Sequence, residues 1–281
     1  MIGVNIAVRL QKCGIFLTRI IPLKIADRIA RLIGGFSYFI LKRKREYILN
    51  NLRHIMPGEK GMHNNLCRKT FENFARCMVD FFRLGFLDKN EVIRYVIPDG
   101  IENLDEALKM KKGCILLTLH IGNWDYAGSY LAACNYPMNA LVEETETEMF
   151  NLYTKHREAT GLKTFPLSRT SVAFLDTIKN NRILAILADR DIAKQGKEFR
   201  FLSGKRRLPE GLGEIIVKRK IPVVFGYMVL IEGEKRYLGV VEPVKTFDNE
   251  NEFYQYMIGN FERIIKKYPE QWFVFHPEWV E

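Results

Sequence analysis

The sequence has few cysteines, and none of them stands in a pairing or metal-binding arrangement. There are five among 281 residues, without a C-x-x-C pair and without a histidine at the spacing of zinc ligands: Cys13, Cys67, Cys77, Cys114 and Cys134. Because their neighbours are mostly apolar, we expect reduced thiols buried in a core, in a cytoplasmic setting. The pattern predicts no structural zinc, and we expect no metal and no other cofactor.

Long uncharged hydrophobic runs are also missing. A membrane-spanning helix needs ~20 consecutive, predominantly apolar residues; no segment reaches that length, and no good secretory signal peptide is present. Residues 1–41 are apolar but are interrupted by seven charged side chains, namely Arg9, Lys12, Arg19, Lys24, Asp27, Arg28 and Arg31. Basic residues among Ile, Leu and Phe, followed by the basic cluster at 42–45, favour helices that lie at a membrane interface. An ordinary amphipathic helical layer packed on a core is the alternative.

The common nucleotide-binding signatures are absent too. The chain has neither G-x-G-x-x-G nor G-x-x-x-x-G-K-[ST], which counts against a nucleotide-dependent enzyme. The formal net charge of +10 is compatible with nucleic acid, an anionic membrane surface, or an acidic protein or phosphate-bearing substrate. No recognisable nucleic-acid motif accompanies this charge, so a non-catalytic nucleic-acid-binding module is kept only as an alternative class.

Hydrophobic spacing divides the chain into two regions, residues 1–90 and residues 91–281. The first is predicted to be helical, because Ile25, Ile29, Leu32 and Ile33 have the three-to-four spacing of an apolar helix face. In the second, short strands are predicted at 92–98, 114–119, 140–143, 164–167, 183–188, 223–229 and 237–242. Helices are predicted at 100–112, 124–133, 149–160, 170–180, 211–218 and 252–267. This alternation implies an α/β fold with a largely parallel central sheet flanked by helices.

Two residues that can do chemistry follow the strand predicted at 114–119. Active sites of such folds gather beyond the carboxyl ends of strands; His120 stands directly after this strand, with Asp125 five positions further on. Gly122 permits a tight turn, so that the Asp125 carboxylate can reach one imidazole nitrogen while the other faces a substrate. A histidine held in this way can take a proton from a hydroxyl as its oxygen attacks a thioester. A structural histidine that caps the next helix is the alternative.

A second polar cluster follows the strand predicted at 183–188. Asp189, Arg190 and Asp191 need solvent, a ligand or each other at this position. Arg190 suits a phosphate, unless the two aspartates hold it structurally. The basic stretch at 194–207 comes next; it suits an acidic carrier or lipid headgroups, unless it is merely solvated.

Together these segments resemble the lipid A biosynthesis acyltransferases (lauroyl and myristoyl transferases), a branch of the lysophospholipid acyltransferase superfamily. The resemblance covers nearly the whole chain and rests on NLRHIMP (51–57), HIGNWD (120–125), KHREATGLKTFPL (155–167), ADRD (188–191) and FLSGKRRLPEGLGEIIVKRKIPVVFGYM (201–228). HIGNWD is similar to the family's signature of a histidine, four residues and an acid, with aspartate where many lipid A enzymes have glutamate. The arginine in ADRD is more familiar from the related phosphatidylinositol mannoside acyltransferases of mycobacteria.

The resemblance implies an O-acyltransferase that moves a fatty acyl group from acyl carrier protein or coenzyme A to a hydroxyl of a membrane lipid. The acceptor would be a lipid A precursor, a phosphatidylinositol mannoside or another lysophospholipid. Its implied site residues are His120 as general base, Asp125 as the partner of that base, and Arg157, Asp189, Arg190 and Glu210 as substrate-binding residues. Residues 1–45 would hold the enzyme on the anionic cytoplasmic face of the bacterial inner membrane, as a peripheral or monotopic protein that binds no nucleic acid.

Overall fold

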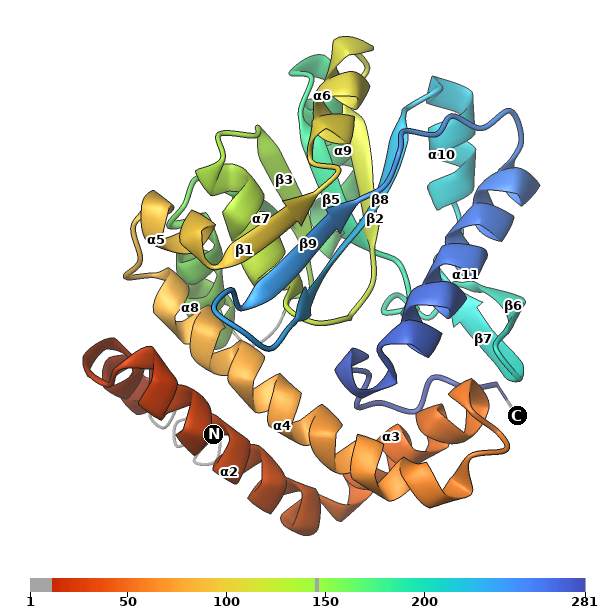
Figure 1. The fold of residues 1–281 in the computed structure, drawn as a ribbon. Helices are drawn as coiled ribbons and strands as arrows, with labels where there is room; N and C mark the ends of the chain where they lie inside the picture. Colours follow the sequence, from red (N-terminus) through yellow and green to blue (C-terminus); the bar gives the residue numbers. More distant parts are fainter. Residues whose placement is uncertain (1–11, 145–146, 281) are drawn as a thin grey trace.

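The central feature of the computed structural model, which describes residues 12–144 and 147–280, is a twisted sheet with helices on both faces (Figure 1). Seven strands of the described chain form it in the order β1-β9-β8-β2-β5-β3-β4. Their bounds are β1 Val96–Asp99, β2 Cys114–Thr118, β3 Met138–Val142, β4 Lys163–Pro166, β5 Ile183–Leu187, β8 Val223–Leu230 and β9 Tyr237–Val241. Strands β4, β3, β5, β2 and β8 run parallel, whereas β9 is antiparallel to β8 and parallel to β1. The expectation of a largely parallel sheet in an α/β fold is confirmed.

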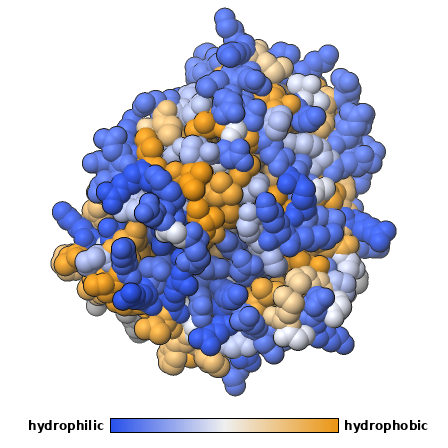
Figure 2. Space-filling view, viewed as in Figure 1, coloured by the Kyte–Doolittle hydropathy of each residue, from blue (hydrophilic) through white to orange (hydrophobic). Residues whose placement is uncertain are grey.

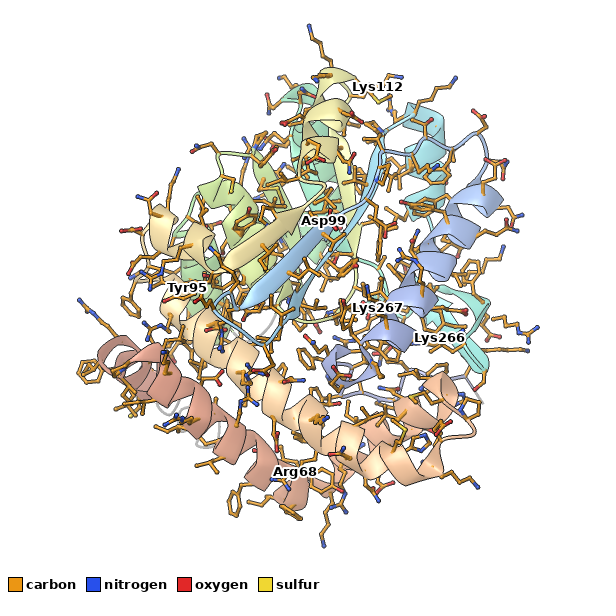
Figure 3. All side chains as sticks on the ribbon, viewed as in Figure 1. Arg68, Tyr95, Asp99, Lys112, Lys266 and Lys267 are labelled. Carbon is orange, nitrogen blue, oxygen red and sulfur yellow. The ribbon has the colours of Figure 1, made fainter. Side chains whose placement is uncertain are left out.

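Helices cover both faces of the sheet, because the strands carry apolar side chains on both faces. Strand β2 shows this most clearly: Ile115 and Leu117 belong to the core on one face, whereas Cys114 and Leu116 belong to the core on the other. The helices of the α/β region are α5 Lys89–Arg94, α6 Glu102–Lys109, α7 Trp124–Ala133, α8 Thr147–Glu158, α9 Thr170–Lys179, α10 Leu212–Arg219 and α11 Glu250–Lys267, with short 3-10 turns η1 Leu167–Arg169 and η2 Pro269–Gln271. Lys112, before β2, lies at the edge of the sheet away from α4, and Tyr95, before β1, lies at the edge near it (Figure 3). His120, after β2, therefore lies at the edge near α4.

Two segments differ from their sequence predictions. The first half of the strand predicted at 92–98 is helix α5, because Asp88 caps it and Glu91 reaches back to the Asp88 amide in a capping box. The stretch predicted as a basic loop holds an antiparallel hairpin of β6 Lys197–Phe201 and β7 Gly204–Leu208. The charged residues of this hairpin hide a two-residue alternation in which Phe201, Arg206 and Leu208 point inward and are buried.

The N-terminal region is helical, as predicted, although residues 1–11 of the expected membrane-associating segment lie outside the described residues. It contains α2 Leu23–Ile40, α3 Lys42–Ile55 and α4 Lys60–Leu84, and α2 packs along α4 beside the sheet edge (Figure 1). The two helices approach closely because small residues of α2 face α4: a Cβ on Gly34 would lie only 2.6 Å from the backbone of Glu72. Among the described residues, no helix combines the length and apolar character needed to cross a bilayer. Three of the five free cysteines are buried, and Cys13 is exposed.

The outward face of α2 carries large apolar side chains rather than polar ones. They are Ile25, Ile29, Leu32, Ile33, Phe36, Phe39 and Ile40, and Leu32 is 74% and Phe36 66% exposed. Figure 2 shows this hydrophobic surface along the lower left rim of the molecule, where Figure 1 places α2. The spacing of these residues correctly predicts a helix face, but that face is not packed on the core of the described chain. Contiguous exposed apolar surface of this kind marks an interaction site.

Candidate active site

The register of the sheet positions His120. Thr118 at the end of β2 pairs with Leu187 at the end of β5, so the residues two places further on, His120 and Asp189, also meet. Beyond His120 the chain turns sharply at Gly122, whose φ is +55° and where a Cβ would lie 1.9 Å from the carbonyl oxygen of Met228. No side chain fits there, and the turn leads directly into α7.

The imidazole of His120 is bound to Asp189. Its Nδ1 lies 2.7 Å from Oδ1 of Asp189, and the same oxygen accepts the His120 backbone N–H at 3.1 Å. Because a carboxylate can only accept, Nδ1 carries the hydrogen, and in the neutral ring Nε2 then keeps its lone pair. Nε2 has no hydrogen-bond partner among the residues that the structure describes, and the His120 side chain is 14% exposed. The geometry thus fixes a tautomer that can accept a proton at Nε2.

Asp189 is a buried carboxylate whose charge is compensated from several sides. Burial would raise its pKa, but His120, Arg206 and the hydrogen bond from Trp272 lower that pKa to about 2. The Trp272 Nε1 donates to Oδ2 over 2.8 Å. Asp189 is therefore ionised at neutral pH and can stabilise a positive charge on the imidazole beside it.

Arg206 belongs to the basic stretch for which the sequence left an acidic carrier, lipid headgroups or solvent as alternatives, but it is completely buried behind Asp189. Its guanidinium carbon lies 4.8 Å from the ring centroid of Trp272, 5.3 Å from that of Trp279 and 5.6 Å from that of Phe201. Burial lowers the pKa of Arg206 to about 10, which Asp189 opposes. The inward position of Arg206 in the β6–β7 alternation is the sequence signal that could have identified it.

Asp125 does not take the place predicted for it at the imidazole. Its Oδ1 accepts a hydrogen bond from Arg157 Nε at 2.7 Å, and both side chains are 17% exposed. Burial opposes the charge of Arg157, but Asp125 raises the pKa of the guanidinium. Asp125 lies in the first turn of α7 and Arg157 in the last turn of α8, so their ion pair joins the two helices. The hydrogen-bonded partner of His120 is Asp189, and the fold, not the five-residue spacing, decides this.

Arg190 and Glu210 lie in different surroundings. Arg190 is bound to Glu278 at 2.9 Å and lies 3.6 Å from a carboxylate oxygen of Glu143. It lines the same cavity as His120, whereas Glu210 is exposed ahead of α10 and does not line that cavity. The structure brings together His120, Asp125, Arg157 and Arg190 around one space, with Asp189 behind His120, but does not bring Glu210 to it.

The shared space is a cavity of about 360 Å³ that is mostly apolar. Its charged and polar lining residues include His120, Asp125, Arg157, Arg190 and Glu143, and the other lining residues are largely aliphatic and aromatic side chains from the sheet and α7. Leu116, Leu131 and Val240 are examples of this apolar lining. An apolar cavity with few convergent polar groups suits a ligand with a long hydrocarbon part and a reacting polar end. Across residues 12–144 and 147–280, no group of three or more His, Cys, Asp or Glu side chains could hold a metal ion.

Comparisons with known proteins identify the family of this chain. The family model described as bacterial lipid A biosynthesis acyltransferase matches residues 6–281. A phosphatidylinositol mannoside acyltransferase of Mycolicibacterium smegmatis is 25% identical over 256 residues, covering 88% of this chain and 83% of the relative. The phosphatidylinositol mannoside acyltransferase of Mycobacterium tuberculosis is 24% identical over 255 residues, covering 88% of this chain and 80% of that relative. The resemblance expected from the sequence is thus confirmed, and the chain is an O-acyltransferase that belongs to the bacterial lipid A biosynthesis acyltransferase family.

Proposed function

We propose that the enzyme transfers a fatty acyl group from an acyl thioester to a hydroxyl of a membrane lipid, with His120 as general base and Asp189 as the residue that orients it. The observation that carries this proposal is the 2.7 Å contact between His120 Nδ1 and Asp189, which leaves Nε2 available in the apolar cavity. Membership of the family sets aside the nucleic-acid-binding alternative.

The proposed reaction needs no covalent enzyme intermediate. Nε2 of His120 accepts the hydroxyl proton while the hydroxyl oxygen forms a bond to the thioester carbonyl carbon. The tetrahedral intermediate then collapses, the carbon–sulfur bond breaks, and the proton passes from His120 to the departing thiolate. Asp189 remains ionised throughout and stabilises the imidazolium that forms between the two steps.

Different lining residues of the cavity suit the two substrates of this reaction. The apolar lining residues suit the acyl chain, and the lining residues Arg157 and Arg190 suit phosphate or headgroup oxygens. In this account Asp125 holds Arg157 in position, because a guanidinium bound through Nε at 2.7 Å and through Nη2 at 3.5 Å still presents Nη1 to a ligand. Asp125 thus acts on substrate through Arg157, and the signature histidine and acid serve different parts of one site.

For the acceptor, the proposal favours a phosphorylated glycolipid. The two relatives act, by their names, on phosphatidylinositol mannoside, and the family is named for lipid A, so a phosphate-bearing sugar lipid is the shared chemistry. A lysophospholipid is the alternative acceptor. For the donor, we propose an acidic acyl carrier protein, with acyl-coenzyme A as a weaker substitute. The exposed cations Lys197, Arg200, Lys205 and Arg207 of the β6–β7 hairpin support electrostatic steering of such a carrier.

A lipid acceptor places the enzyme at a bilayer. The exposed apolar face of α2 can be buried among headgroups and acyl chains, and neighbouring Lys and Arg side chains are attracted to an anionic leaflet. We therefore propose peripheral or monotopic attachment through this face to the cytoplasmic side of the bacterial inner membrane. Of the basic cluster at 42–45, Lys44 donates to the Phe275 carbonyl and Arg45 lies over the Tyr38 ring, so only part of that cluster is free for lipid.

The proposal is tested by replacing the base. His120→Ala should lower the rate of acceptor-dependent thiol release from an acyl thioester ~10²–10⁴-fold, the usual contribution of a positioned general base. His54→Ala is the matched control, because His54 stacks on Trp279 outside the cavity. Circular dichroism should show both variants folded. Near-normal turnover in folded His120→Ala protein would rule out the mechanism.

A further inference from the structure

A second hollow, separate from the active-site cavity, lies between the start of α2 and the loop that joins β8 to β9. Its volume is about 960 Å³. Its walls are formed by residues 22–24, 27–28, 31, 94–95 and 231–236 together with Arg76 of α4. No residue lines both this hollow and the cavity that contains His120. Tyr95, one of its wall residues, is seen above α4 at the sheet edge (Figure 3).

The hollow is strongly basic. Its positively charged lining residues are Lys24, Arg28, Arg31, Arg76, Arg94, Lys235 and Arg236, against the acidic Asp27, Glu232 and Glu234. Two of these acids are already engaged: Asp27 lies 2.8 Å from Arg76 and 2.7 Å from Arg236, and Glu232 lies 3.0 Å from Arg31. The excess of cations is therefore not neutralised by the chain around it.

Several donors in this hollow have unused capacity. Nη2 of Arg236 is buried and has no hydrogen-bond partner in the described chain, although the other two nitrogens of this guanidinium are bound to Asp27 and Asp80. Exposed Lys24 and Arg28 make no ion pair with the described residues. The first turn of α2 contains no acidic residue, and Pro22 provides no side-chain cap, so the positive end of the helix dipole is also open. An anion with several acceptor oxygens would be attracted by all three features.

The position of the hollow restricts what that anion can be. Ile25 and Ile29, on the exposed apolar face of α2, lie within one turn of Lys24 and Arg28 in the sequence of the same helix. A phospholipid joins its phosphate to its acyl chains through a single glycerol unit, so one molecule can place the phosphate in the hollow and the chains along α2. A free phosphate would use only the first of these two surfaces.

We propose that this hollow binds the phosphate of an anionic phospholipid of the bilayer, as a docking site distinct from the acyl-transfer site. The proposal rests on the proposed seating of α2 at the membrane but not on the acyl-transfer chemistry. Such a site would fix the orientation of the enzyme, because α2 and the edge of the sheet that bears His120 lie on the same side of the molecule (Figure 1). The bound lipid would thus orient the active-site mouth toward the membrane.

The experiment compares two double variants of the full-length protein that remove the same charge. Lys24→Gln with Arg28→Gln removes two exposed cations of the hollow, and Lys218→Gln with Arg219→Gln removes two exposed cations of α10, at the far end of the molecule (Figure 1). Binding is measured to phosphatidylcholine vesicles with and without phosphatidylglycerol. Since each basic residue near an anionic surface contributes about 1 kcal/mol, the first variant should bind phosphatidylglycerol vesicles ~30-fold more weakly and the control less than ~3-fold.

Four outcomes would overturn the proposal. Equal losses in the two variants would mean diffuse attraction rather than a site, and an unchanged phosphatidylglycerol preference in the hollow variant would exclude these residues. Calorimetry with inorganic phosphate in the absence of vesicles would reveal a soluble-phosphate site if it gave tight binding that the hollow variant abolished. Wild-type protein that transfers acyl groups in detergent but shows no preference for phosphatidylglycerol would contradict this inference and the proposed attraction to an anionic leaflet, but not the acyl-transfer chemistry. Lipid preference without acyl transfer would contradict only the proposed acyl-transfer chemistry.

Discussion

At the scale of residues, two aspartates hold charges that the fold stabilises. Burial would raise the pKa of Asp27, but Arg236 and Arg76 lower it to about 2. Asp189 reaches a pKa of about 2 against a still larger degree of burial, through His120 and Arg206. An aspartate in an unfolded chain titrates near ~3.9, so the folded state of this protein holds both groups in their charged form more firmly than the unfolded state does.

This difference predicts the acid stability of the protein. A depressed folded pKa contributes stability that is complete above the unfolded value and is lost as pH falls through the folded value. The free energy of unfolding should therefore decrease from about pH 4 down to about pH 2. Urea unfolding at a series of pH values checks this, and Asp27→Asn should reduce the slope over that range. If the variant keeps the full pH dependence of the wild type, Asp27 is not a source of it.

The pairing of His120 with Asp189 is a contact that the sequence alone did not predict. His120 and Asp189 were both identified as polar residues at strand ends, but their contact depends on β2 and β5 being neighbours although β3 and β4 lie between them in sequence. Short-range spacing favoured Asp125, because local sequence patterns do not reveal the order of strands in a sheet. Asp125 was correctly placed on the first turn of the next helix, where it meets Arg157 instead.

At the scale of elements, helix α2 buries its small side chains and exposes its large apolar ones, the reverse of a typical surface helix. Small residues, Ala26, Ala30, Gly34 and Gly35, are buried, and the large apolar residues face outward. The small residues explain the close packing on α4, because even a Cβ on Gly34 would meet the Glu72 backbone. The apolar periodicity was visible in the sequence, whereas the direction in which that face points was not, since an apolar face can be buried by a core or by a bilayer.

The outward face of α2 gives the prediction at this scale. Leu32→Ser combined with Phe36→Ser should weaken binding to phosphatidylglycerol vesicles by at least ~10-fold, because burying one large apolar side chain contributes ~1.5–3 kcal/mol. Leu175→Ser is the matched control: Leu175 is 64% exposed but lies on α9, away from α2 (Figure 1). Vesicle flotation measures both. Binding of the α2 variant that equals the wild type would mean that another surface docks on the membrane.

At the scale of the whole molecule, the site is assembled from distant parts of the chain. His120 follows β2, Asp189 follows β5, Arg206 lies on β7, and Trp272 follows η2 near the C-terminus. The alternation of strands and helices was enough to predict the sheet and the edge at which the site lies. The alternation in the hairpin marks Arg206 as an inward-facing residue. Its contact with Trp272 could not be predicted, because that contact depends on the hairpin and the C-terminal segment folding back against Asp189.

The central claim is that Asp189 orients the catalytic histidine while Asp125 acts through Arg157, and one comparison of variants tests it most directly. The kcat and KM of acceptor-dependent thiol release are measured for Asp189→Asn and Asp125→Asn, with folding checked by circular dichroism. Asp189→Asn should lose ~10²–10⁴-fold in kcat with little change in KM, because an amide neither fixes the tautomer nor stabilises the imidazolium. Asp125→Asn should act mainly through a raised KM for the lipid acceptor. A folded Asp189→Asn enzyme with near-normal kcat, beside an Asp125→Asn enzyme that has lost it, would contradict the account.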